Sequence, residues 1–170
     1  ARPDEKTGVY NLEPPLIPAQ EHWDKDSTWN PPFELAYWHW GLTVASEWKK
    51  RLGQEPDSLW TKVLDHLPAP VSIDGLYMGI GNAPDSYSNP LNMRDHPMVL
   101  GTLGMLPLWD QIDPEKMRNT LKLIMDQWNW QHTWGWDYPM VAMCATRLYE
   151  PEITLDALLM EVQKNTCLVN

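Results

Sequence analysis

The chain has 170 residues and a formal net charge of −10 at pH 7, a length that suits one domain. With 23 Asp and Glu residues against 13 Lys and Arg residues, it lacks the excess of cations that phosphate backbones require, so no nucleic-acid partner is expected. No apolar run is long enough to cross a bilayer, and no membrane partner is expected.

The composition is unusual in its 16 proline and 11 tryptophan residues, beside a single phenylalanine. Proline at this level argues against a simple bundle of long helices and predicts stiff connections between elements. Tryptophan combines a flat apolar face with one N–H donor, which suits both core packing and stacking on sugar rings. Most of the tryptophans are expected in the core.

The first part of the chain is predicted to be irregular. Residues 1–17 form an extended lead-in, in which Pro14 and Pro15 favour an extended backbone. A polar loop follows and carries a carboxylate at Glu21. The N-terminus lacks the apolar core of a signal peptide, but a cleaved one would leave no trace. The compartment is therefore open, with a periplasmic or extracellular location favoured over the cytoplasm.

The longest predicted helix runs from Phe33 to about Leu52 and ends at Gly53, a common C-terminal signal. Asn30 is a candidate N-cap, because its side chain can accept from a free backbone N–H. The apolar residues do not fall on one stripe, and a helix that is apolar on every side is normally enclosed by other protein. We therefore expect this helix, with Trp38 at its centre, to be an inner helix.

The middle of the chain is predicted to be mixed. Ser58 caps a shorter helix over 59–67. Residues 71–80 favour a short hairpin with Asp74–Gly75 as its turn. The segment 81–97 is too rich in proline, asparagine and aspartate for regular structure, and loops this long tend to be functional or disordered.

A short apolar helix is predicted over 98–105, and Asp113 followed by Pro114 gives a strong helix start. The apolar residues of this second helix recur at helical spacing and predict packing by one face only. This stripe consists of Met117, Leu121, Ile124, Met125 and Trp128.

Two further helices are predicted at the C-terminal end: 138–148, apolar nearly all round, and 153–164, amphipathic. Enclosed and one-faced helices thus alternate along the chain, as in two concentric layers of helical hairpins. The sequence therefore predicts an all-α fold in which the loops between hairpins line one end.

Cysteine and histidine spacing predicts no metal site and no organic cofactor, because no cluster has ligand spacing. Cys144 and Cys167 are interpreted as two ordinary thiols, although a disulfide between them is left open.

Several stretches from Leu16 onward resemble the catalytic module of the six-hairpin glycosidases, an (α/α)6 toroid, and are similar to glycoside hydrolase families 65 and 95. These stretches are PAQE, NPPFELAYWHWGL, APDSY, DHPMVLGTLGMLP and WGWDYPMVAMCATRLYEPEITLDALLMEVQKNT. Because 170 residues supply only about three of six hairpins, the resemblance implies that residues 1–170 are about half of a toroid, a fragment of a larger enzyme.

The resemblance implies that Glu21 is the general acid of an inverting O-glycosyl hydrolase acting on an oligo- or polysaccharide. Glycosidic cleavage needs one carboxylic acid to protonate the leaving oxygen and a second carboxylate to direct water. Burial among Trp23, Trp29 and Trp38 would raise the pKa of that acid. In the family the base lies on a closing hairpin that this chain lacks.

Six residues are the candidates for substrate binding: Gln20, Asn30, Glu34, Trp38, Trp136 and Asp137. Each has a structural alternative. Asn30 and Asp137 fit helix caps, and Glu34 can answer the positive end of a helix dipole. Glu21 itself could belong to a solvated acidic loop. His96 is interpreted as a structural hydrogen-bonding residue.

Other functions remain open. An inverting phosphorylase would use phosphate in place of water and needs an anion site that the sequence does not show. A non-catalytic carbohydrate-binding module would keep the aromatic groove without the acid pair. The expected partners are a carbohydrate and either the remainder of a toroid or a second copy of the chain.

Overall fold

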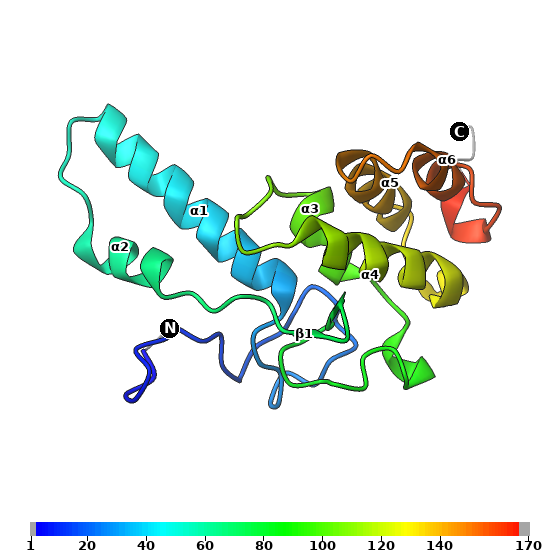
Figure 1. The fold of residues 1–170 in the computed structure, drawn as a ribbon, viewed down its shortest axis with the longest axis horizontal. Helices are drawn as coiled ribbons and strands as arrows, with labels where there is room; N and C mark the ends of the chain where they lie inside the picture. Colours follow the sequence, from blue (N-terminus) through cyan, green and yellow to red (C-terminus); the bar gives the residue numbers. More distant parts are fainter. Residues whose placement is uncertain (1–2, 167–170) are drawn as a thin grey trace.

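The computed structural model describes residues 3–166, and helices dominate this part of the chain, as the sequence predicts (Figure 1). Its α-helices are α1 (Pro32–Arg51), α2 (Ser58–Asp65), α3 (Gly101–Gly104), α4 (Pro114–Gln127), α5 (Asp137–Arg147) and α6 (Pro151–Leu158). Short 3-10 helices lie at Pro90–Asn92 (η1), Met98–Leu100 (η2), Trp130–His132 (η3) and Gln163–Asn165 (η4). The fold is therefore mainly α-helical.

The one named sheet within residues 3–166 is a two-stranded hairpin of β1 (Ser72–Ile73) and β2 (Leu76–Tyr77). Its turn is the predicted Asp74–Gly75 pair, with φ of 50° and 78°. Positive φ at both central residues matches the twist of an antiparallel pair, which confirms the hairpin prediction.

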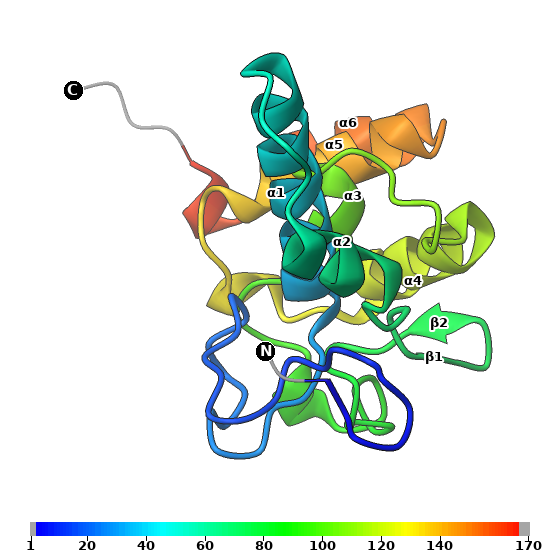
Figure 2. The ribbon, with the colours of Figure 1, turned by 90° about the vertical axis from the view of Figure 1, so that its left-hand side faces the viewer.

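The loops gather at one end of the molecule. Figures 1 and 2 show the lead-in, the loop before α1 and the irregular chain between α2 and α3 below the helices. The lead-in contains no helix over residues 3–17, as predicted, and it is tied down where Tyr10 N–H donates to the carbonyl of His66 at 3.0 Å.

Helix α4 confirms its predicted start and its predicted stripe. The side chain of Asp113 accepts hydrogen bonds from the backbone N–H groups of Glu115 (2.8 Å) and Lys116 (3.4 Å). Met117, Leu121 and Ile124 are fully buried, Trp128 is buried and Met125 is partly buried. This helix packs by one face, on which Thr120 is also buried, and exposes Glu115, Asn119, Lys122 and Asp126 on the other.

Helix α5 is buried over most of its surface, although Met143 is exposed. It approaches α3 closely at Gly104, where a Cβ atom would lie closer than 3.0 Å to the carbonyl oxygen of Met140. Two helices can pack at this distance only where one of them lacks a side chain. The loop end of α5 is thereby fixed against the core.

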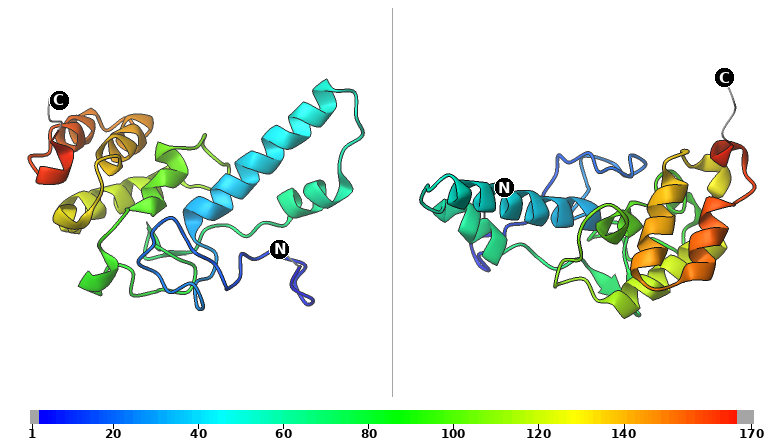
Figure 3. Two further views of the ribbon diagram at one scale, coloured as in Figure 1. Left: turned by 180° about the vertical axis from the view of Figure 1, so that it is seen from behind. Right: turned by 90° about the horizontal axis from the view of Figure 1, so that it is seen from above.

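The prediction that the helix beginning at Phe33 is enclosed is wrong. Only Pro32, Leu35 and Ala36 are buried in α1, while Trp38 is 53% exposed and Trp48 is 57% exposed. Figure 3 shows the C-terminal part of α1 extending away from the other helices, with α2 beside it. The apolar pattern is present, but within residues 3–166 few segments cover it.

Two predicted helix caps are also corrected. Asn30 does not cap α1, because Pro31 stands at the N-cap and no side chain caps this helix. Asp57, not Ser58, caps α2 by accepting from the N–H groups of Leu59 and Trp60.

Helix α6 ends at Leu158, six residues before the predicted end at Lys164. The side-chain amide of Asn165 donates to the carbonyls of Leu158 and Met160, both at 3.0 Å, so the chain turns back on itself there.

None of the helices within residues 3–166 is long and apolar enough to span a bilayer. Cys144 is a free thiol inside α5, and burial raises its pKa to about 12. Such a thiol is protonated at physiological pH and therefore unreactive. Cys167 lies outside the described residues.

Candidate functional site

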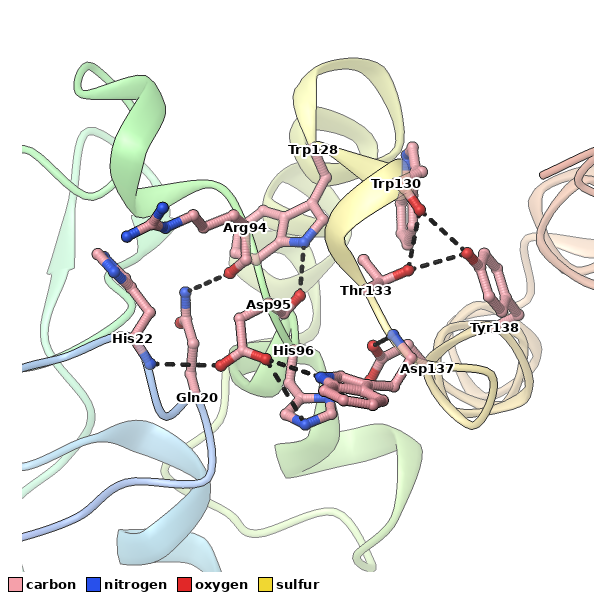
Figure 4. A network of polar contacts seen from close by, with 11 residues as sticks. Gln20, His22, Arg94, Asp95, His96, Trp128, Trp130, Thr133, Asp137 and Tyr138 are labelled. Atoms are coloured by element: carbon pink, nitrogen blue, oxygen red, sulfur yellow. Dashed lines mark hydrogen bonds and ion pairs between the residues drawn. The ribbon is translucent and has the colours of Figure 1, made fainter. Parts of the chain in front are cut away.

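Three connecting segments meet at the loop end of the molecule: the loop before α1 (18–31), the loop before η2 (81–97) and the turn before α5 (129–136) (Figure 4). Gln20 joins the first two, since its side-chain amide donates to the carbonyls of Asn92 (3.0 Å) and Arg94 (3.1 Å). The site is thus built from segments far apart in the sequence.

The centre of the cluster is an ion pair between His96 and Asp137. Their Nδ1 and Oδ1 atoms are 2.9 Å apart, and the Asp137 side chain has no exposed surface. The other carboxylate oxygen of Asp137 accepts from the backbone N–H of Trp134 at 2.8 Å. Asp137 therefore lies inside the first turn of α5 and does not cap it, which corrects the predicted capping role.

Asp95 is the second carboxylate beside the imidazole. Its Oδ1 lies 3.7 Å from Nε2 of His96 and accepts from the indole N–H of Trp134 at 3.1 Å. Its Oδ2 accepts from the backbone N–H of His22 at 3.3 Å. Asp95 has φ of 63°, a left-handed conformation that non-glycine residues adopt mainly where the surroundings enforce it.

Two tryptophans flank the imidazole. The ring of His96 lies 4.2 Å from that of Trp136 and 6.1 Å from that of Trp134, measured between ring centroids. Trp134 and Trp136 are 52% and 41% exposed, so both present indole surface to solvent. The ammonium of Lys164 lies 4.8 Å from the Trp134 ring centre.

Burial alone would lower the pKa of His96, but the hydrogen bond and the charge of Asp137 raise it, and the charges of Asp95 and Glu21 add to that effect. The net result is a pKa above the ordinary value. The His96 imidazolium is therefore stabilised by acidic groups from the loops 18–31 and 81–97 and from the first turn of α5.

Glu21 lies beside this cluster, because the backbone N–H of the next residue, His22, donates to Asp95 at 3.3 Å. The side chain of Glu21 is exposed, so the expectation that it is buried among Trp23, Trp29 and Trp38 is wrong. An exposed carboxylate can reach a ligand at the loop end. Residues 3–166 do not shield it from water.

Two of the predicted substrate-binding residues use their side chains within the protein. Gln20 is 3% exposed, and its oxygen accepts from the indole N–H of Trp23 at 3.0 Å while its amide nitrogen makes the two bonds above. Asn30 accepts from the N–H of Leu12 at 2.7 Å and donates to Asn11 at 2.8 Å. The hydrogen bonds of both side chains therefore connect loop 18–31 to other segments of the chain.

Glu34 is also engaged. Its carboxylate accepts from the backbone N–H of Ala19 at 2.5 Å, which holds loop 18–31 on the first turn of α1. Burial raises the pKa of Glu34 more than this hydrogen bond lowers it. Burial therefore raises the pKa of a carboxyl group whose role is to hold the loop in place.

Trp38 lies in a different place from the cluster. It lines a groove of about 500 Å³ with Leu42 of α1 and Trp60 of α2, and no residue of loop 18–31 contributes to that groove. The structure therefore brings Glu21, Trp136 and Asp137 to one end of the molecule and leaves Trp38 outside their group.

Sequence reasoning missed Asp95 and Trp134 as members of the cluster. The signal in the sequence was the pair Asp95–His96 in a proline-flanked loop. It does not identify Asp137, the partner of His96, which lies 41 residues further along the chain. Within residues 3–166 no group of three or more His, Cys, Asp or Glu side chains is arranged to hold a metal ion.

Comparisons with family models, with curated proteins and with solved structures found no match to this chain.

Proposed function

We propose that this chain is part of a glycoside hydrolase in which Glu21 protonates the leaving glycosidic oxygen, and that its helices form about half of an (α/α)6 toroid. The observation that carries the proposal is the meeting of Glu21 with Asp95, Asp137 and two exposed indole faces at one end of a helical fold. Carboxylates beside aromatic faces are the groups that glycosidic cleavage needs.

The geometry supports different roles for the two tryptophans and for Glu21. Trp134 and Trp136 offer flat apolar surfaces on which the apolar face of a sugar ring can stack. Glu21 can reach the oxygen between two sugar units, because its side chain is exposed. An inverting mechanism then requires a second carboxylate on the opposite side of the sugar, with space for a water molecule.

The exposure of Glu21 sets a condition on this mechanism. A general acid is most effective when its pKa is near the working pH, which for a carboxyl group requires desolvation. A bound saccharide or a second protein surface over loop 18–31 would remove water from Glu21. The proposed activity therefore depends on the loop end being covered.

The same exposure favours a second candidate, a non-catalytic carbohydrate-binding module. Such a module needs the faces of Trp134 and Trp136 and has no use for a desolvated acid. In that case Glu21 would contribute only a hydrogen bond to a sugar hydroxyl.

Substitution of Glu21 by Gln separates the two candidates. Release of reducing sugar from polysaccharides and of phenol from aryl glycosides would be measured with and without phosphate, since phosphate dependence identifies a phosphorylase. Glu21→Gln is expected to lower turnover by about 10²-fold or more. Glu47→Gln, at an exposed position on α1, is the matched control.

Turnover within a few-fold of wild type in Glu21→Gln would remove Glu21 from the mechanism. Retention of a polysaccharide without any hydrolysis, unchanged by Glu21→Gln, would favour the binding module.

A further inference from the structure

A continuous set of contacts leads from His96 to the backbone beside Glu21. Nε2 of His96 faces Oδ1 of Asp95 at 3.7 Å, and Oδ2 of Asp95 accepts from the backbone N–H of His22 at 3.3 Å. His22 follows Glu21 directly in the chain. The Asp95 carboxylate therefore holds the backbone directly beside Glu21, while Gln20, Asn30 and Glu34 hold other parts of loop 18–31.

The orientation of the His96 ring is fixed from the opposite side. Asp137 accepts at 2.9 Å, so Nδ1 must carry a proton, because an ionised carboxylate has no proton to donate. The Trp136 ring, 4.2 Å away, limits rotation of the imidazole. Nε2 is thus held toward Asp95 whatever the protonation state of the ring.

The charge on His96 decides whether its contact with Asp95 is attractive. In the imidazolium both nitrogens donate, one toward each carboxylate. In the neutral ring with Nδ1 protonated, the lone pair on Nε2 faces the Asp95 oxygen, and two acceptors repel each other. The charged groups around the ring are Asp137, Asp95 and Glu21, with Lys164 on the far side of Trp134.

We propose that His96 is a positioning residue for Glu21: as an imidazolium it holds Asp95, and through the bond from His22 to Asp95 it positions the backbone beside Glu21. Deprotonation of His96 releases Asp95 and lets Glu21 move away from the position in which it serves catalysis. This inference rests on the proposed role of Glu21, but the movement of the loop can be measured without hydrolysis.

The sign of the pH dependence follows from the raised pKa of His96. A histidine whose pKa is raised by folding contributes its full stabilisation below about pH 6.5, the ordinary value, and loses it as the pH rises through the folded pKa. The loop is therefore held at pH values below the pKa of His96 and released above it.

The test is an NMR titration of the chain with ¹³C-labelled histidine rings and ¹⁵N-labelled amides. The His96 ring signal is expected to titrate above the ordinary midpoint. The backbone amide of His22 and the indole N–H of Trp134, which both donate to Asp95, are expected to move with the same midpoint.

Two variants connect these signals to His96. His96→Gln should abolish the shared titration, whereas His66→Gln, at an exposed residue whose ring bonds to the carbonyl of Lys62, should leave it unchanged. Asp137→Asn keeps His96 and removes its closest charge, so the midpoints of the ring and of the two reporters should fall together. Circular dichroism would confirm that each variant is folded.

Reporters that do not move, that follow the His22 ring instead, or that still titrate in His96→Gln would overturn the inference. In the activity measurement, His96→Gln is expected to lower kcat by up to about 10²-fold at pH 6 with little change in KM, the loss that a displacement of about 1 Å can cause. The loss of wild-type kcat as the pH rises through the pKa of His96 should be absent from the variant. Failure of Glu21→Gln to affect hydrolysis would instead refute the proposed function and leave the NMR result standing.

Discussion

Substitution of Gly104 by Ala tests the close approach of α3 to α5. The added Cβ would lie closer than 3.0 Å to the Met140 carbonyl oxygen, 3.0 Å from its Cγ and 3.2 Å from its carbonyl carbon. Because two of these atoms belong to the backbone, no rotation of a side chain can relieve the clash, and one helix must shift.

Inserting a methyl group into a tight contact costs about 1–3 kcal/mol, and a clash with backbone belongs at the upper end of that range. For a protein of this size, about 3 kcal/mol corresponds to a fall in Tm of roughly 6–12 °C. At Gly101 the nearest atom is the terminal methyl of Met98, a flexible side chain, so Gly101→Ala should cost less.

Thermal and urea unfolding followed by circular dichroism would measure these differences. Gly41→Ala is the matched control, because a Cβ at this position in α1 meets nothing within 4 Å. Replacing glycine by alanine inside a helix stabilises it by about 0.5–1 kcal/mol, so the control should raise Tm slightly. A Tm for Gly104→Ala equal to that of the control would refute the packing of α3 on Met140.

Two other predictions concern helix ends and exposed surface. Asp57→Ala should destabilise the chain by about 1 kcal/mol in urea unfolding because it removes the cap of α2, whereas a loss of the same size in Ser58→Ala would contradict the capping assignment. The exposed aromatic residues of α1 should bind a hydrophobic dye and promote association, and Trp48→Lys should reduce both; a compact monomer that binds no dye at any concentration, measured by light scattering, would contradict this expectation.

Features that depend on neighbouring residues in the sequence were predictable. The cap at Asp113, the stripe on α4 and the turn at Asp74–Gly75 follow from local chemistry, and the structure has all three. The cap of α2 shows the limit of such reasoning, because Asp57 and Ser58 are adjacent good caps. The choice between them depends on where the backbone enters the helix.

Features that depend on distant partners were not predictable. Asn30 has the right chemistry for a cap, but its bonds to Leu12 and Asn11 hold it at φ of 44°, outside the N-cap conformation. His96 and Asp137 lie in separate segments, and no periodicity connects them. The apolar surface of α1 predicts that something covers the helix, but a periodic pattern carries no information about the identity of the covering segment.

The Glu21 carboxylate, in its proposed role, and the exposed aromatic face of α1 both require a second surface that removes them from water. A proton donor for glycosidic cleavage needs a low-dielectric surrounding, and exposed tryptophans gain free energy when another surface removes them from water. Covering the loop end would desolvate Glu21, while in the proposed mechanism the His96–Asp95 contact positions the backbone beside it. For the proposed acid, positioning and desolvation are thus separate tasks, the first assigned to residues of this chain and the second dependent on what binds there.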